Sequence, residues 1–554
     1  LSDLLVYAAL PWVLRLFVRA ESGLRGAKQT QLLATAVLFA AVVFAFVPTF
    51  LAVVVWVAIA WTIGGIIARV NVRQAIAIGR VVLAMVVGAL VLNAPWVSQF
   101  ADSKWMDHFV GVQAASMQRV GLVQLARFDG GLLRFGIIAL GLYIPVFVSV
   151  VVTRSTTFIW ATRSLSLVVF TGVLIVAIDA NVLNIAAPSL GQLLAIVACG
   201  IALGAGALAS FVFDDELTLA YRWWKPIVSF AVAVSFVGAL PAVSMAVGGS
   251  WNQSKTAIAD LYTQLQANPP EGDYNVVYVG RSEALPISAM RVTDEVAFAV
   301  ADDGELTMRD RWVKPNGLSS NVESALHAII WRETVRGGRL LAPLAIRYVV
   351  IPQIDGGEST IDKPLPLPEG LLAALSTQLD FRRVYLASDL VIYENMAWVP
   401  SLSVLDENSS ALSKQAGDEV LLSSVLQSTM PIARVDDVSS VPTEVGASTV
   451  YLAVPFSDRL RLEVAGVDVL PRIAFGGTTA FDVSDGGSAT LHYSTPISQY
   501  FFVLVQSLLW LLVMLAVFDI GRIKRRLSIA RKREVIVIGD QDSPAFSFST
   551  GGDQ

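Results

Sequence analysis

The sequence is short of charge, cysteine and histidine, and each shortage excludes a class of protein. Of its 554 residues, 15% are charged and 55% are hydrophobic, whereas soluble domains carry about 25% charged residues. This apolar excess requires a membrane. The single cysteine, Cys199, excludes an intrachain disulfide and a cysteine metal cluster. The three histidines are far apart in sequence, so we expect no histidine metal site and assign no metal ligand: His108, His327 and His492.

The charge that is present does not indicate a nucleic-acid partner. The net charge is −5, and no basic face is interleaved with aromatic residues as nucleic-acid binding requires. Much of the positive charge instead lies in short segments between apolar runs. This distribution is typical of a membrane protein whose partner is the lipid bilayer.

The C-terminal stretch predicts the orientation of the whole chain. Residues 500–518 form an apolar run without charge, long enough to cross a bilayer as a helix. Basic residues follow at once, and Lys and Arg beside a span stay in the cytoplasm. We therefore expect a last transmembrane helix over 498–520, a cytoplasmic tail over 521–554 and an extracytoplasmic region over 249–497. The basic residues are Arg522, Lys524, Arg525, Arg526, Arg531, Lys532 and Arg533.

Residues 1–248 predict a transmembrane domain of about eight helices. The apolar windows are 4–18, 31–47, 50–68, 76–95, 132–152, 158–178, 190–213 and 226–247. Pro11 interrupts the first window, which predicts a truncated or re-entrant helix. Because the chain starts at Leu1 in apolar sequence, we also expect a preceding N-terminal part.

The short loops between these windows agree with that orientation. The turns predicted outside, near Pro48 and between Asp179 and Pro188, carry no Lys or Arg. Each loop predicted inside is basic, as cytoplasmic loops are. Their cations are Arg15, Arg19, Arg25 and Lys28; Arg69, Arg73 and Arg80; Arg154 and Arg163; Arg222 and Lys225.

One outside loop, residues 96–131, holds the candidate site. Its acidic groups and histidine suit binding of a metal-bound phosphate or general-base catalysis at the membrane surface. The sequence identifies no cofactor, and a divalent metal ion at this loop is the one that its residues would suit. The catalytic candidates are Asp102, Asp107 and His108, and the substrate-binding candidates are Trp105, Arg119, Arg127 and Asp129. The alternative is a solvated connector, because apolar residues recur there at the spacing of an interfacial amphipathic helix.

The polar region predicts two layers. Over 249–405, β-rich runs at 275–279 and 347–351 alternate with helical patterns at 322–336 and 370–379, which favours an α/β domain. Residues 406–440 are rich in Ser and Asp and predict a linker with one short helix. Over 441–497, short strands separated by Gly-, Asp- and Ser-rich turns predict a small β-sandwich. Those strands are 450–454, 460–464, 479–483 and 490–493.

Several single side chains in this region have both a functional and a structural interpretation. Tryptophans offer flat apolar surfaces for stacking on sugars, but we favour packing roles for Trp312, Trp331 and Trp398. Asp179, at the outer end of a span, is a functional candidate by position, or it simply reaches water. We assign structural roles to the remaining notable groups: Glu394 and Asn395 at a strand end, His327 as a half-buried helix residue, and His492 on a strand.

Four segments together resemble a known family. They are VYVGRSEALP (277–286), EVAFAVADDGELTMRDRW (295–312), RLLAPLAIRYVVIP (339–352) and LVIYENMAWVPSLSVL (390–405), with LNAPW (92–96) and GGSATLHY (486–493) in support. This order resembles the outer-domain signatures of large actinobacterial multi-pass membrane glycosyltransferases. The resemblance runs through most of 75–520, and its motifs are structural.

The resemblance implies a fold and an activity. In that family, a family 2 glycosyltransferase domain often precedes a membrane region similar to type C glycosyltransferases. Such proteins transfer a hexosyl or pentosyl group from a polyprenyl-phosphate-linked sugar to a glycan or lipid outside the bacterial plasma membrane. We find no family 2 domain with its Asp-x-Asp-type metal motif in this sequence, so the resemblance supplies no catalytic residue.

Two further hypotheses come from other classes of protein. One is a non-catalytic glycan-binding or assembly module that serves an enzyme domain on the N-terminal part. The other is a transporter, which the sequence disfavours because few charges lie inside the apolar windows.

Overall fold

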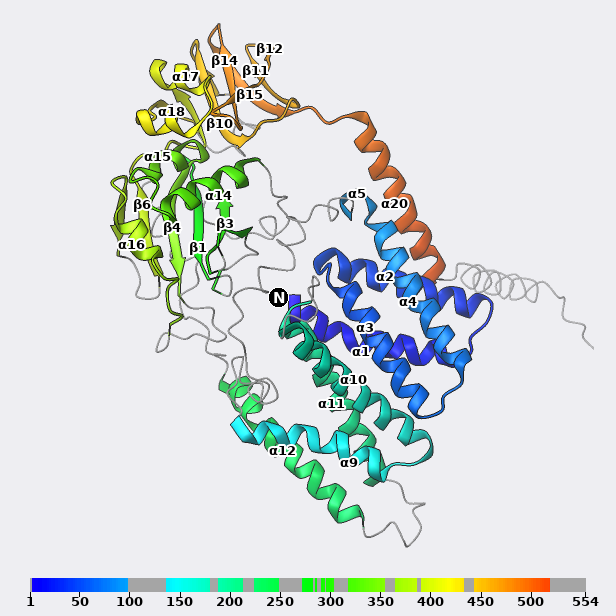
Figure 1. Cartoon of the computed structure of the whole chain (residues 1–554). Coiled ribbons are helices and arrows are strands. Elements are labelled where there is room, and N and C mark those ends of the chain that lie inside the picture. Colours follow the sequence, from blue (N-terminus) through cyan, green and yellow to red (C-terminus); the bar gives the residue numbers. More distant parts are fainter. Residues whose placement is uncertain are drawn as a thin grey trace, which may run out of the picture. The chain divides into compact units, whose positions relative to one another are not determined.

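The computed structural model (Figure 1) describes residues 2–97, 136–179, 188–212, 224–248, 272–281, 284–285, 290–293, 295–302, 317–353, 364–385, 390–432 and 443–518. Within these ranges, helix forms at each predicted apolar window. The helices are α1 (Ser2–Glu21), α2 (Ala27–Phe46), α3 (Phe50–Ile67), α4 (Val72–Leu92), α5 (Ala94–Val97), the 3-10 helix η2 (Gly136–Tyr143), α9 (Ile144–Val152), α10 (Ser155–Asp179), α11 (Leu190–Val212), α12 (Trp224–Gly248) and α20 (Ile497–Phe518).

Six of the described helical stretches are long and apolar enough to cross a membrane: Ala27–Phe46, Phe50–Ile67, Val72–Leu92, Thr157–Ile178, Leu190–Ser210 and Ile497–Phe518. Two shorter apolar helices cover Ile138–Val152 and Pro226–Leu240. Helix α1 is not among the six, since it carries Asp3, Arg15, Arg19 and Glu21 and contains Pro11. A helical membrane part is therefore confirmed: six helices within the described residues qualify as spans by length and composition, and the predicted number of nine is not reached among them.

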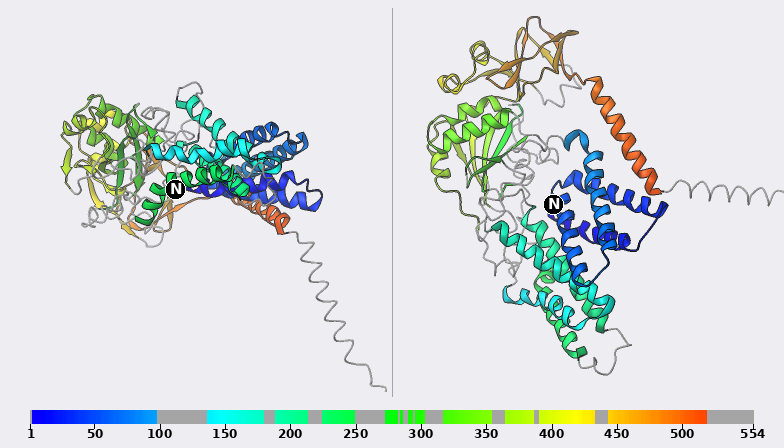
Figure 2. Two further views of the ribbon diagram at one scale, coloured as in Figure 1. Left: turned by 90° about the horizontal axis from the view of Figure 1, so that it is seen from below. Right: turned by 45° about the vertical axis from the view of Figure 1, so that its right-hand side comes forward.

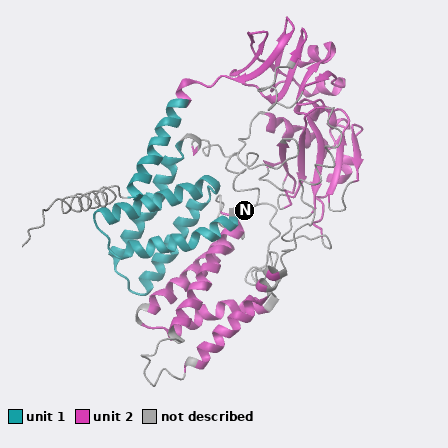
Figure 3. Ribbon diagram, turned by 180° about the vertical axis from the view of Figure 1, so that it is seen from behind, with its two compact units in different colours: residues 1–95, 500–554 teal, residues 96–499 magenta. Residues whose placement is uncertain are grey.

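The chain divides into two compact units, residues 1–95 with 500–554 and residues 96–499 (Figure 3). In the first unit, three side-chain hydrogen bonds hold α20 to helices made far earlier in the chain. Gln506 Nε2 and Trp510 Nε1 donate to the Leu92 carbonyl oxygen at the end of α4, at 2.9 and 3.0 Å. Gln31 Nε2 of α2 donates to the Val517 carbonyl oxygen at 2.8 Å. The last helix thus completes the N-terminal bundle.

A small residue and a buried amide bring α2 and α4 together. A Cβ on Gly88 of α4 would lie 2.5 Å from a Val37 methyl group of α2, so only glycine allows this approach. Buried Asn93, next after α4, donates from Nδ2 to the Ala41 carbonyl oxygen at 3.3 Å. Small residues and polar contacts are what associate helices in lipid, where apolar surface gives little driving force.

The same principle packs α10 on α11 in the second unit, where the two helices lie side by side (Figure 2). Ser164 Oγ of α10 donates to the Gly200 carbonyl oxygen of α11 at 2.6 Å. One helical turn later, a Cβ on Gly204 would lie 2.7 Å from Ser164 Oγ and 3.0 Å from Val146 Cα of α9. Gly200 and Gly204 form a small-xxx-small motif against two neighbouring helices.

The α/β domain contains a six-stranded mixed sheet in the order β2-β3-β1-β4-β6-β5. Strands β1 and β4 are parallel, and the other neighbours are antiparallel. The strands are β1 (Asn275–Gly280), β2 (Met290–Arg291), β3 (Ala297–Asp302), β4 (Ile346–Pro352), β5 (Phe381–Val384) and β6 (Leu390–Asn395). The helices are α14 (Gly317–Ile330), α15 (Gly337–Leu341), the 3-10 helix η6 (Ala342–Leu344) and α16 (Leu371–Ser376).

Alternation along the strands places a core on each face of this sheet. Val277 and Val279 of β1 pack in a cluster with residues of α14 and α16, such as Leu326 and Leu375. Their neighbour Tyr278 points to the other face, where a second cluster is buried. Both faces of the sheet are therefore covered, which explains the continuous apolar runs of β1 and β4.

Two further sheets form a β-sandwich. One has the order β13-β14-β10-β7-β8 and the other β12-β11-β15-β9. Val450 and Phe481 of the first sheet share a core with Leu462, Val464 and Leu491 of the second. The strands are β7 (Leu402–Leu405), β8 (Ser428–Pro431), β9 (Thr443–Val445), β10 (Ser448–Pro455), β11 (Leu460–Val464), β12 (Val467–Val469), β13 (Arg472–Ala474), β14 (Thr478–Val483) and β15 (Gly487–Tyr493).

The segment 406–440, expected as a linker, is described to residue 432 and is built into the sandwich. It holds α17 (Glu407–Ser413), α18 (Asp418–Ser423) and β8, which pairs with β7. Asp406 caps α17 by accepting from the Ser409 amide at 2.7 Å. The first sheet of the sandwich therefore begins at Leu402, well before the predicted boundary at 441.

We predict that replacing Gly204 destabilises the membrane helices. Gly204→Leu forces α11 away from α10 and α9, and such overpacking costs about 1–3 kcal/mol. Gly206→Leu is the matched control, because a Cβ on Gly206 meets nothing within 4 Å. The measurement is the free energy of unfolding of the purified chain in a mixed-detergent titration. Equal stability of the two variants contradicts the prediction.

Candidate functional site

The loop residues singled out from the sequence lie outside the residues that the structure describes. They are Asp102, Trp105, Asp107, His108, Arg119, Arg127 and Asp129. The basic tail 521–554 and Trp312 also lie outside. The described part of the chain instead offers three features: a cavity between membrane helices, a charged cluster in the α/β domain and a group of ligand-type side chains on the sandwich.

An apolar cavity of about 520 Å³ lies among η2, α9, α10 and α11. Its volume is within the usual range of ligand pockets, about 300–1,000 Å³. One phenol group, that of Tyr143, interrupts an otherwise apolar wall. The lining residues are Leu140, Tyr143, Ile144, Phe147, Val168, Gly172, Ile175, Val176, Leu194 and Val197. Such a wall suits a hydrocarbon chain.

The lining residues come from three helical segments, η2 with α9, α10 and α11. They come from η2 and the first half of α9, from the second half of α10 and from the first turns of α11. The topology predicted from the sequence has these helices cross the membrane in alternating directions, which would put these positions on one side of the bilayer. In the topology predicted from the sequence, that side is the outer leaflet.

Arg163 precedes the cavity-lining residues of α10 in sequence. It lies within α10 and not in the predicted inside loop. It is 3% exposed, and its guanidinium carbon lies 5.9 Å from the centre of the Trp160 ring. A buried cation in a span is expensive, which makes it a functional candidate. Its place in the first half of α10 puts it toward the opposite helix end from the cavity, so we assign it no contact with a ligand there.

In the α/β domain, Arg347 is buried among aromatic rings. Its guanidinium carbon lies 4.6, 5.3 and 5.5 Å from the ring centres of Trp398, Tyr348 and Tyr274. Nη2 lies 3.3 Å from Glu394 Oε1, and both side chains are 11% exposed. This cluster buries a charge pair with cation–π contacts on three sides.

Glu394 also pairs with a second arginine: exposed Arg382 donates a hydrogen bond to its other carboxylate oxygen. This hydrogen bond and the attraction of the carboxylate raise the pKa of Arg382. The next residue, Asn395, donates from Nδ2 to the carbonyl oxygens of Gly338 and Ile346, both at 2.9 Å. Glu394 and Asn395 therefore hold neighbouring segments of the domain together, as their structural interpretation predicts.

The predictions for two tryptophans and one histidine have different outcomes. Trp398 is partly buried and packs against the second core of the sheet, as expected. Trp331 is 52% exposed, so the packing role was wrong for it. It stacks on His327, with ring centres 4.1 Å apart and planes at 9°. His327 is exposed rather than half-buried, and its Nδ1 lies 3.9 Å from Glu333. The spacing of four residues within the predicted helix 322–336 was the sequence signal for this stacked pair.

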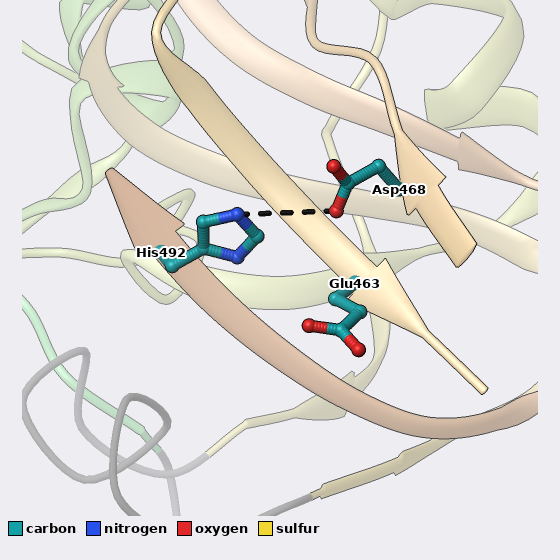
Figure 4. Close-up of side chains that lie close together, drawn as sticks. All are labelled: Glu463, Asp468 and His492. Atoms are coloured by element: carbon teal, nitrogen blue, oxygen red, sulfur yellow. Dashed lines mark ion pairs between the residues drawn. The ribbon is translucent and has the colours of Figure 1, made fainter. Parts of the chain in front are cut away.

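The sequence alone predicts no metal ligand, but the sandwich gathers three side chains of that type. Ligand atoms of Glu463, Asp468 and His492 lie within 4.8 Å of one another (Figure 4). They come from β11, β12 and β15, three adjacent strands. Glu463 is partly exposed, and the other two are exposed. The usual search for histidines and cysteines close in sequence misses this group, because only the strand register brings His492 to the carboxylates.

Comparison of the chain with models of known protein families, with curated proteins and with solved structures finds no match.

We predict that Glu394→Gln destabilises the α/β domain by about 3–5 kcal/mol, because removing one partner of a buried ion pair leaves the other charge buried without its counter-ion. The control is Glu333→Gln, which removes an exposed carboxylate beside His327 and changes stability by about 1 kcal/mol or less. The measurement is thermal unfolding of the purified chain followed by circular dichroism. Equal losses in both variants contradict the prediction.

Proposed function

We propose that this chain is the membrane module of a bacterial cell-envelope glycosyltransferase. It holds a polyprenyl-phosphate-linked sugar and transfers the sugar to a glycan or lipid on the outer face of the plasma membrane. In this proposal the architecture is type C-like with nine spans. Residues 249–497 are extracytoplasmic, and the C-terminus is cytoplasmic.

The apolar cavity is the observation that carries the proposal. A polyprenyl chain needs a hydrocarbon-lined space between helices, and the cavity supplies about 520 Å³ with an almost wholly apolar wall. The lining residues share the helix ends that the positive-inside rule assigns to the outer leaflet. A lipid held there carries its phosphate and sugar at the outer surface, the side on which the sequence predicts the loop 96–131.

The loop residues supply the chemistry in this proposal. A carboxylate of Asp102 or Asp107, or the imidazole of His108, takes the proton of the acceptor hydroxyl. The hydroxyl oxygen then bonds to the anomeric carbon, and the bond to the lipid phosphate breaks. Arg119 and Arg127 balance the phosphate charge, Trp105 stacks on the sugar and Asp129 accepts from its hydroxyls. The carboxylates of this loop would hold a divalent metal ion, which when bound would supply Lewis-acid stabilisation of phosphate charge.

A substitution that partly fills the cavity tests whether a lipid chain binds there. Gly172 lines the cavity, and a Cβ on it meets nothing within 4 Å. Gly172→Leu displaces about two methylene groups of a bound chain, each worth about 0.8 kcal/mol, so binding weakens about tenfold. The measurement is photocrosslinking of a polyprenyl phosphate probe to the chain in nanodiscs, over a range of probe concentrations.

Gly206→Leu is the control for that experiment. Gly206 also has open space around its Cβ and lies on a membrane helix, but it is not part of the cavity wall. Unchanged crosslinking in Gly206→Leu with a weakened response in Gly172→Leu supports the proposal. If wild type and Gly172→Leu bind the polyprenyl phosphate probe with the same affinity, the cavity is not the lipid site.

A second candidate function is a non-catalytic glycan-binding or assembly module. The exposed Trp331 favours it, because a flat ring stacked on His327 at the surface can pack against the apolar face of a sugar. In this case the chain positions the glycan for an enzyme domain elsewhere in the protein.

We predict that Trp331→Ala weakens binding of isolated cell-envelope glycan about threefold to tenfold, the loss of one aromatic contact worth about 0.5–1.5 kcal/mol. Leu379→Ala is the control, since it removes another apolar side chain that is exposed on the same domain. The measurement is glycan binding to the purified chain by microscale thermophoresis. If both variants bind as wild type does, Trp331 is not part of a glycan surface.

A further inference from the structure

We propose that Glu463, Asp468 and His492 form a binding site for one divalent metal ion of the zinc class. The three side chains project from the solvent face of the four-stranded sheet of the sandwich (Figure 4). This inference is independent of the proposed transferase activity, because it concerns the sandwich and not the membrane cavity.

The strand register fixes the three side chains on one face. Glu463 of β11 is directly opposite Asp468 of β12, and Arg461 of β11 is directly opposite His492 of β15. The intervening residue Leu462 is buried in the sandwich core. Side chains alternate along a strand, so Arg461 and Glu463 both face away from that core. Three hydrogen-bonded strands thus position the ligand atoms, rather than a mobile loop.

The distances suit a shared ion. Protein ligands bind Zn²⁺ at about 2.0–2.2 Å, so two ligand atoms on one ion lie about 3–4 Å apart. His492 Nε2 and Asp468 Oδ1 are 3.9 Å apart, too far for a hydrogen bond and right for two ligands of one ion. All three ligand atoms lie within 4.8 Å of one another, a spread that a small side-chain rotation closes.

The charges on this face also favour a cation. Two carboxylates directly opposite on adjacent strands repel each other and destabilise the pairing. The nearest arginine on the same face, Arg461, turns its guanidinium to backbone, since Nη1 donates to the carbonyl oxygens of Asp458 and Leu460. An ion between Glu463 and Asp468 removes the repulsion and joins the edge strand β12 to β11 and β15.

The ligand set indicates which ion. Imidazole with carboxylates suits Zn²⁺ and its transition-metal neighbours, whereas Mg²⁺ and Ca²⁺ take oxygen ligands. Three protein ligands leave at least one position of the ion open to solvent, since Asp468 and His492 are exposed.

The experiment is a calorimetric titration of the metal-free full chain in detergent with ZnCl₂. We expect saturable Zn²⁺ binding in the wild type. The affinity weakens at least about tenfold in His492→Ala, Asp468→Asn and Glu463→Gln, because losing a direct ligand costs no less than losing an outer-shell partner. The control is His327→Gln, which removes an exposed histidine that also has a carboxylate 3.9 Å away. This control retains wild-type binding.

A second measurement guards against misfolded variants. Zn²⁺ raises the unfolding temperature of the wild type and of His327→Gln, and this shift is lost in Asp468→Asn, whose metal-free unfolding temperature stays near that of the wild type. The proposal is overturned if no saturable Zn²⁺ binding occurs, or if the three ligand variants bind Zn²⁺ as tightly as the wild type.

Discussion

Association of helices in a solvent as apolar as their own surfaces is the constraint on which this molecule depends. In lipid, burying another leucine gains little, so close backbone approach and a few polar bonds decide which helices pair. Gly88 performs this role between α2 and α4, and Gly200 and Gly204 perform it for α11. The cavity among η2, α9, α10 and α11 follows from the same packing, because Gly172 leaves open space on the helix that Ser164 ties to α11.

The sheet region obeys the opposite rule, since water surrounds its exposed surface and apolar burial drives its folding. Its two layers are continuous with each other: Ala342 and Val399 share a core with Tyr451 and Phe475 of the sandwich. The Tyr451 hydroxyl donates to the Pro343 carbonyl oxygen, and burial raises the pKa of that phenol. The α/β domain and the sandwich are therefore built as one packed body around this cluster.

What could be predicted from the sequence is what depends on local pattern. Apolar windows gave the helix positions, and alternation placed β11 at Leu460–Val464, its observed bounds. Two of the three failures involve partners distant in the chain, and the third is a local backbone reversal. Strand β8 looked like linker because its pairing with β7 crosses two helices. The helix expected over 322–336 ends at Ile330, as Arg332 takes a positive φ of 59°. His492 reaches Glu463 and Asp468 only through the register of β11 with β15.

The closure of the first bundle by α20 has a consequence for the order of assembly. A ribosome makes the helices α1–α4 before α20, and the partners of the Leu92 carbonyl oxygen, Gln506 and Trp510, emerge more than 400 residues later. Until then, the Leu92 carbonyl oxygen lacks these two hydrogen bonds, while α9–α12 and the sheet region are synthesised. Truncation anywhere between Leu92 and Gln506 thus leaves α1–α4 without α20, so closure of this bundle depends on synthesis reaching that helix.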